Sequence, residues 1–179
     1  MAWSCVAIVI AFAAHTGVIA ETSWDLPPDS SQEAVRLELF AMPLCPYGRD
    51  ALAALLRAAQ EYPGEIKLDI CYIAAERDAA AAVGPTRYLS SSGIDDVLAG
   101  IRAVVIEHLY PTAYLDYLRR GVARPSASWE EWALEENLDT KLIDAYCSSE
   151  QGLRWYEENT AVARTRQVAS PDAPASWEG

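Results

Sequence analysis

The chain has 179 residues, of which 51% are hydrophobic and 22% charged, and its formal net charge is −12 at pH 7. This length and composition predict one globular domain with enough mass to bury a core. Because a chain this acidic repels phosphates, we expect it not to bind nucleic acid.

The first 20 residues form an apolar segment without a charged side chain, and Glu21 is the first charge. Two interpretations stay open. As a signal peptide, the segment would be cleaved near Ala20, although it lacks the usual positive n-region. As an uncleaved helix, it would span roughly 28 Å, close to the hydrocarbon thickness of a bilayer. We favour an anchor that holds the body on the periplasmic side of a membrane; cleavage would instead give a secreted or periplasmic soluble protein.

Residues 21–33 are polar and rich in turn formers, which predicts a linker. Apolar and polar side chains then alternate over 35–41, the pattern of a half-buried strand. Leucines at helical spacing follow over 50–60, Tyr62-Pro63-Gly64 ends that helix, and alternation returns over 66–73. Strand, helix and strand together predict a right-handed parallel crossover unit.

The second half of the chain has helical periodicity. Apolar spacing predicts a long helix over 94–109, closed by Pro111, and a second helix that ends at Gly121. The biased patches at 79–82 and 90–92 predict a loop between the second strand and these helices.

Three further helices are expected after the second one. Ser128 and Glu131 predict a capping box at the start of the first of them. A short helix is predicted around Ile143, and Ser148 with Gln151 predicts the start of the last helix.

The first strand runs into Cys45-Pro46-Tyr47-Gly48, and a helix follows. This is the layout of a thioredoxin-type redox site, with glycine in place of the second cysteine. Together with the second strand, the helical block and Val168-Ala169-Ser170-Pro171, it resembles the thioredoxin-like superfamily, in particular its DsbA-like branch. The resemblance implies an α/β fold: a thioredoxin-like βαβ core within 34–171, with a helical subdomain inserted at about 90–165. It also implies that Pro171 occupies the cis-proline position that faces the cysteine motif.

Two departures from the family pattern matter. Gly48 replaces the resolving cysteine, so the motif holds one sulfur. After Pro171 only a tail of residues 172–179 remains, which is too short for the two strands and closing helix of the family. We therefore expect the C-terminal strands to be missing and an edge strand to need cover from a helix or a partner chain.

Cys45 is the candidate catalytic residue if the protein is redox-active. At a helix N-terminus the helix dipole favours the thiolate, which is the nucleophilic form. Without a second thiol in the motif, a mixed disulfide at Cys45 cannot be released from within it. Cys71, expected on the more polar face of its strand, and Cys147, at the end of a short helix, could supply that thiol or form a structural disulfide, and the sequence places neither near Cys45.

Two tryptophans are candidates for interfaces. Trp24 falls just past the apolar segment, where an interfacial anchor lies. Trp177 lies in the tail, where it has no core to join, and we expect it to be buried against a partner. The two histidines, His15 and His108, are too far apart to suggest a zinc site, and no cofactor or metal is expected.

These observations favour a non-catalytic thioredoxin-like protein that serves as an accessory or stabilising subunit of a larger membrane complex, for example a respiratory or photosynthetic one. Residues 1–20 would contact the lipid bilayer. One alternative is an exported monothiol disulfide oxidoreductase or isomerase that uses Cys45 as nucleophile and Pro171 to hold the substrate. Another is a secreted soluble binding module.

Overall fold

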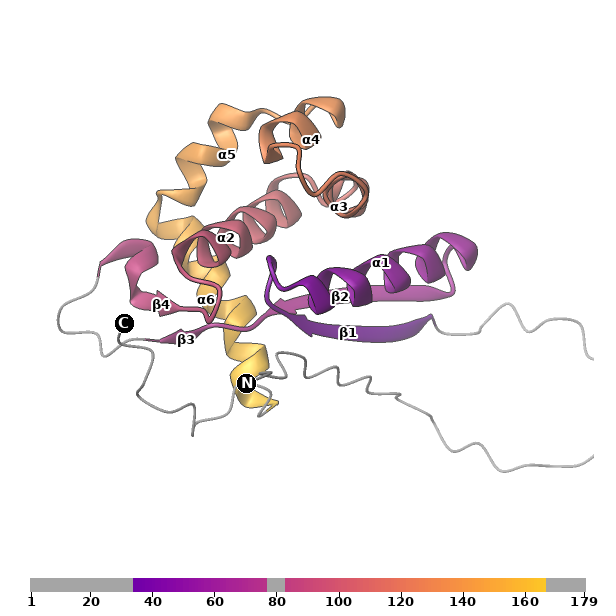
Figure 1. The fold of residues 1–179 in the computed structure, drawn as a ribbon, viewed down its shortest axis with the longest axis horizontal. Coiled ribbons are helices and arrows are strands. Elements are labelled where there is room, and N and C mark those ends of the chain that lie inside the picture. The colour runs from indigo at the N-terminus through magenta and orange to yellow at the C-terminus, as the bar shows by residue number, and fades with distance from the viewer. Residues whose placement is uncertain (1–33, 77–82, 167–179) are drawn as a thin grey trace, which may run out of the picture.

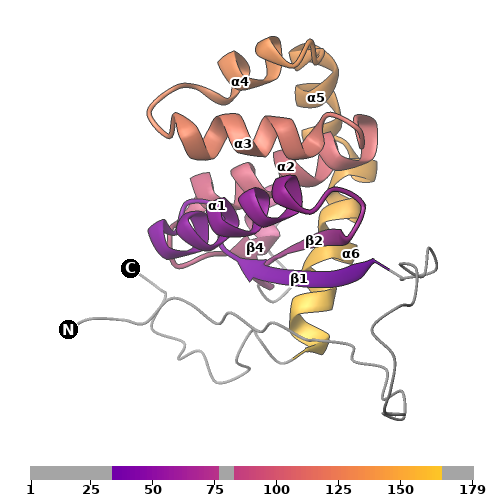
Figure 2. The same cartoon turned by 90° about the vertical axis from the view of Figure 1, so that its right-hand side faces the viewer.

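The computed structural model describes residues 34–76 and 83–166. The apolar segment 1–20, Trp24, Pro171 and Trp177 lie outside the described residues. Within the described part the protein is an α/β structure with six α-helices and two small sheets (Figures 1 and 2). Of the helices described, none combines the length and apolar character needed to cross a membrane.

The predicted crossover unit is confirmed. Strands β1 (Val35–Ala41) and β2 (Ile66–Tyr72) pair in parallel along their full length, and α1 (Pro46–Glu61) connects them. The helix begins at Pro46, directly after Cys45, and the leucine spacing over 50–60 lies inside it. Proline is favoured at the first helical position because its φ is already helical and its missing N–H would have no partner there. The helix therefore starts inside the Cys-Pro-Tyr-Gly motif.

Five helices form the block that follows, with α2 at its centre (Figure 1). They are α2 (Ile94–Leu109), α3 (Tyr114–Ala123), α4 (Trp129–Glu135), α5 (Thr140–Cys147) and α6 (Glu150–Thr165). Helix α2 contacts α3, α5 and α6, and its apolar stripe is fully buried at Ile101 and Val104. The predicted cap of α4 is confirmed, since the Ser128 hydroxyl accepts a hydrogen bond from the N–H of Glu131.

Two predicted helix boundaries were wrong. Gly121 does not end the second helix but lies inside α3, where an added Cβ would be 3.0 Å from Cζ3 of Trp132. The glycine is therefore explained by close packing of α4 on α3. The last helix is capped by Ser149 and not by Ser148: the Ser149 hydroxyl accepts a hydrogen bond of 3.1 Å from the N–H of Gly152.

Residues 90–92 are loop, as predicted, and 79–82 lie outside the described residues, but two short strands flank this region. Strands β3 (Ala75–Glu76) and β4 (Tyr88–Leu89) pair in antiparallel fashion, and a 3₁₀ turn, η1 (Gly84–Arg87), precedes β4. Strands of two residues are too short to show periodicity, so the alternation test could not detect them.

The parallel sheet lies between α1 and α6, as Figure 2 shows. Ile70 and Tyr72 face the main core, which they share with α1 and α2. Phe40 and Cys71 point to the other face and pack with Ala163 of α6. This is the alternation predicted for β2, with Cys71 on the face away from α1.

One side chain covers the outer edge of β2. Asn159 of α6 accepts a hydrogen bond of 2.7 Å from the N–H of Tyr72 and donates one of 2.8 Å to the carbonyl of Ile70. A carboxamide offers one acceptor and a donor side by side, as a peptide group does. Asn159 therefore takes the place of a neighbouring strand at this edge, and among the described strands β1 pairs with β2 alone.

Candidate functional site

The Cys45 turn lies at the carboxyl end of β1, the edge of a parallel sheet at which binding sites commonly form. Cys45 is the N-cap residue of α1, as predicted, and its backbone is extended, with φ −66° and ψ 123°. Its N–H donates to the carbonyl of Met42 over 3.1 Å, and its carbonyl accepts from the N–H of Arg49 over 3.0 Å. Cys45 is only 4% exposed, whereas Tyr47 is 63% exposed. The turn thus presents a tyrosine to solvent and keeps the cysteine beneath it.

Asp96, in the first turn of α2, holds this turn in place. Its carboxylate accepts hydrogen bonds from the N–H of Leu44, at 2.6 Å, and from the hydroxyl of Ser90. Burial raises the pKa of Asp96, and these two hydrogen bonds oppose the rise. Ser91 adds a contact, because its hydroxyl lies 3.0 Å from Sδ of Met42. Asp96 was missed in the sequence, where an acidic residue in the first turn of a helix indicates only a favourable helix dipole.

The two other described cysteines are suppressed as nucleophiles. Burial raises the pKa of both Cys71 and Cys147 to about 11, and at Cys71 repulsion from nearby carboxylates adds to the effect. No disulfide joins Cys45, Cys71 and Cys147 to one another. Since Cys71 lies on the sheet face away from α1, the structure gives it no route to act as the second thiol of the motif.

Gly48 is enclosed by its neighbours. A Cβ added there would lie 3.1 Å from the carbonyl oxygen of Met42 and 3.2 Å from Cβ of Ala41. Both contacts are tighter than ordinary van der Waals distances, and one of them is to backbone, which cannot turn aside. The position of the missing second cysteine is therefore packed to fit glycine.

An apolar pocket of about 120 Å³ lies next to the turn. It forms where α1, α2 and α3 meet over the carboxyl ends of β1 and β2, the arrangement visible in Figure 2. Its walls are mostly aliphatic and aromatic, and they include Leu39, Leu52, Ile70, Tyr117, Leu118 and Trp132. Arg49, in the first turn of α1, is the one charged residue among those that line it. The pocket was not predicted, because its walls come from six separate segments.

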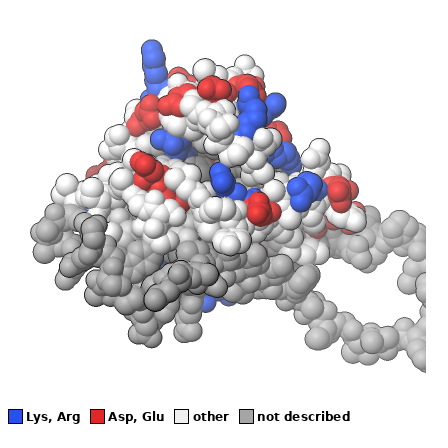
Figure 3. Space-filling model, in the orientation of Figure 1, with Lys and Arg blue, Asp and Glu red and all other residues white. Residues whose placement is uncertain are grey.

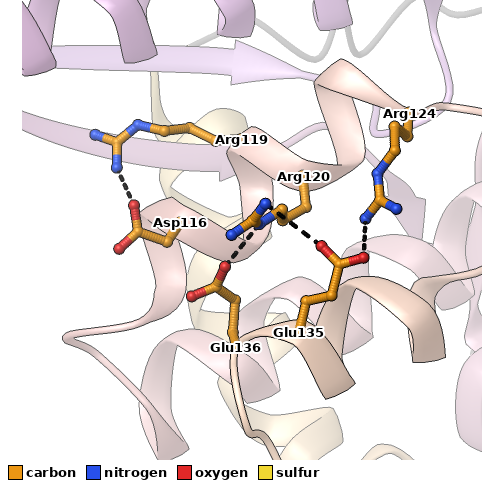
Figure 4. A network of polar contacts seen from close by, with 6 residues as sticks. All are labelled: Asp116, Arg119, Arg120, Arg124, Glu135 and Glu136. Atoms are coloured by element: carbon orange, nitrogen blue, oxygen red, sulfur yellow. Dashed lines mark hydrogen bonds and ion pairs between the residues drawn. The ribbon is translucent and has the colours of Figure 1, made fainter.

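A network of charged side chains lies elsewhere, at α3 and the end of α4 (Figure 4). It consists of three arginines and three carboxylates: Asp116, Arg119, Arg120, Arg124, Glu135 and Glu136. Arg120 bridges both glutamates, with its Nε 2.8 Å from Glu136, and Arg124 lies 2.7 Å from Glu135. Arg120 and Arg124 therefore link α3 to the end of α4, whereas Arg119 pairs with Asp116 within α3. Each of the three arginines has an acidic partner, which makes the network a poor site for an anionic ligand.

The face of the molecule seen in Figure 3 has no large patch of charges of one sign. Figure 3 shows acidic and basic side chains interspersed over the helical part of this face. In residues 34–76 and 83–166, no group of three or more histidine, cysteine, aspartate or glutamate side chains is arranged to hold a metal ion. No protein-family model matches the chain, and no curated protein matches it either.

Proposed function

We propose that the protein is a non-catalytic, thioredoxin-like accessory subunit. It would stabilise a larger membrane assembly outside the cytoplasm, to which residues 1–20 tether it. The observation that carries the proposal is the Cys45 turn: the cysteine caps the helix of a parallel βαβ unit, and among the described residues the two other cysteines are buried and have raised pKa values.

Thiol–disulfide exchange needs an accessible thiolate and a second thiol that releases the mixed disulfide. Cys45 is buried, and the position three residues on is packed around glycine. With a pKa of about 11, Cys71 and Cys147 would each be about 1 part in 10⁴ thiolate at pH 7. These features support a protein whose remaining role is to bind and not to exchange disulfides.

The order of elements supports the thioredoxin-like part of the proposal. A parallel βαβ unit with the cysteine at the N-cap of its helix is followed by a helical block. The last helix of that block, α6, returns to the sheet. Its Ala163 packs on the face opposite α1, and its Asn159 bonds the edge of β2. This is the order expected for a DsbA-like core with a helical insertion.

The test is replacement of Cys45 by serine in the full-length protein, in its native membranes. We expect the variant to enter the same complex as the wild type, in the same amount, on native gels of solubilised membranes. Cys147→Ser is the matched control, because it removes a thiol that is not part of the turn. Loss of complex formation in the Cys45 variant alone would refute a role that does not need the thiol.

One observation favours the monothiol enzyme as a second candidate. Cys45 is the N-cap residue of α1, the position that the nucleophilic cysteine takes in a thioredoxin-type site. The rate of alkylation of the native protein at pH 6 separates the two candidates. A slow rate supports the accessory subunit, and a fast rate that disappears in Cys45→Ser supports the enzyme.

A further inference from the structure

The pocket beside the Cys45 turn has the size of one small apolar group. Its volume is about 120 Å³, and its walls include Leu39 and Ile70, which are almost fully buried. In other proteins, apolar cavities of about 150 Å³ stay dry and bind benzene. A single aromatic ring or a branched chain of about four carbons therefore fits these walls.

Two donors in the wall of this pocket have no partner among the described residues. The guanidinium of Arg49 makes no hydrogen bond or ion pair with another described residue, unlike the arginines of α3 in Figure 4. The indole N–H of Trp132 is buried, and it too has no hydrogen-bond partner. A buried donor such as this indole N–H is rarely left unpaired, because the loss of water costs about 1–3 kcal/mol. Arg49 is half-buried, so its guanidinium keeps contact with water. A ligand oxygen in the pocket would accept from the indole N–H, and a charged one would also pair with the guanidinium.

We propose that this pocket binds a monocarboxylate whose apolar part is one ring or one branched chain. The apolar part packs among the side chains of α1 and α3, and the carboxylate pairs with Arg49, with Trp132 as a further donor. A single cation matches a single negative charge, and a phosphate, with nearly two charges, would need more. This inference rests on the pocket alone and does not depend on the proposed function.

The net charge of −12 bears on how the pocket would select an acid. A field of this sign repels anions in general, so any preference for an acid over its neutral amide must come from a local cation. Phenylacetate and phenylacetamide make that comparison, because they share the ring and differ in charge. We expect the full-length protein to bind phenylacetate at least tenfold more tightly than the amide in a calorimetric titration.

Arg49→Gln should abolish this preference and leave binding of the amide unchanged. Arg57→Gln is the matched control: it removes the same charge from the same helix, at an exposed position about 12 Å further along the axis that does not line the pocket. The proposal is overturned if wild-type protein binds neither compound, if it binds both equally, or if the two arginine variants behave alike.

A second measurement does not depend on these variants. The indole ¹H–¹⁵N resonance of Trp132, assigned by its loss in Trp132→Phe, should shift on titration with phenylacetate. Ala99→Leu, which adds bulk to the pocket wall, should abolish the shift while near-ultraviolet circular dichroism shows that the fold is kept. If Ala99→Leu does not fold, the Trp132 shift in the wild type still decides, and an unmoved resonance would sink the assignment.

The carboxylate could belong to a free acid or to the last residue of a polypeptide. A tetrapeptide that ends in phenylalanine, compared with its C-terminal amide, distinguishes these sources. Preferential binding of the acid form of the peptide assigns the site to polypeptide termini. Binding of phenylacetate without the peptide assigns it to small acids, and equal binding of the peptide acid and its amide contradicts the proposal.

Discussion

The carboxylate of Asp96 accepts a hydrogen bond of 2.6 Å from the backbone N–H of Leu44, across 52 positions of sequence. This contact joins the first turn of α2 to the turn that carries Cys45. Asp96 is 1% exposed, and it also accepts a hydrogen bond from the hydroxyl of Ser90. One of its carboxylate oxygens therefore bonds Leu44 in the Cys45 turn, and the other bonds Ser90, just before α2. The helical block and the βαβ unit are thus held together at the candidate site.

Replacing Asp96 with alanine should therefore lower the free energy of unfolding by about 2 kcal/mol or more, since two donors lose their acceptor. Asp96→Asn keeps an acceptor for Leu44 and should lose clearly less. Urea unfolding measures both. Asp95→Ala is the control, because Asp95 is exposed in the same helical turn; an equal loss there would mean that the helix dipole, and not the bond to Leu44, carries the effect.

The packing around Gly48 gives a prediction with the opposite sign to helix propensity. Alanine is favoured over glycine in helices by about 1 kcal/mol, yet Gly48→Ala should destabilise the protein by about 1 kcal/mol or more, since its Cβ crowds Met42 and Ala41. Gly48→Cys should do the same and should not give a rapidly exchanging dithiol. At the exposed position 54 of the same helix, Ala54→Gly should show the ordinary sign. A Gly48→Ala variant with raised stability would show that the helix end is loosely packed.

Much of the fold could be predicted because local rules decide it. The alternation of apolar and polar residues predicted both ends of β1 correctly. The spacing of apolar residues predicted the long helix α2 over 94–109, as the structure has it. The position of Cys45 at a helix N-terminus follows from the strand that precedes it and the proline that comes after it. In each case neighbours in sequence determine the conformation, so one sequence is enough.

The candidate site itself could not be predicted in the same way. Asp96, Arg49 and Trp132 look like ordinary helix residues in sequence, and they gain their roles from the segments that pack against them. Gly121 shows the same limit, because its reason is the ring of Trp132 on another helix and not the end of its own. Tertiary packing leaves no periodic signal, so these roles become visible only in three dimensions.

The edge of β2 provides a third prediction. Asn159→Ala removes the donor to Ile70 and the acceptor for Tyr72 together, which should cost about 1–3 kcal/mol and speed hydrogen exchange at the amide of Tyr72. Glu158→Ala changes the exposed neighbouring position and should leave both quantities unchanged. An unaltered exchange rate at Tyr72 in the Asn159 variant would mean that this carboxamide does not protect the strand edge.

Glu107 of α2 makes stability depend on pH. Burial, and secondly repulsion from Asp69, raises the pKa of Glu107 from 4.5 to about 7. Between these two values the folded protein holds the proton more tightly than the unfolded chain. The free energy of unfolding must then fall as pH rises from about 4.5 to 7, and above pH 7 the folded state carries the full cost of a half-buried carboxylate.

Glu107→Gln removes that charge at every pH. Its stability should equal that of the wild type near pH 4 and exceed it at pH 8 by roughly 1–2 kcal/mol, a figure already reduced for the part of the carboxylate that solvent screens. Urea unfolding at four or five pH values gives the difference curve. Glu61→Gln, at the exposed end of α1, should give a flat difference curve.

Because Glu107 also contributes to the raised pKa of Cys71, the Glu107→Gln variant should react faster than the wild type with alkylating agents at Cys71 at pH 9. A flat difference curve together with an unchanged rate at Cys71 would show that Glu107 is solvated in the folded protein and that its charge does not act on Cys71.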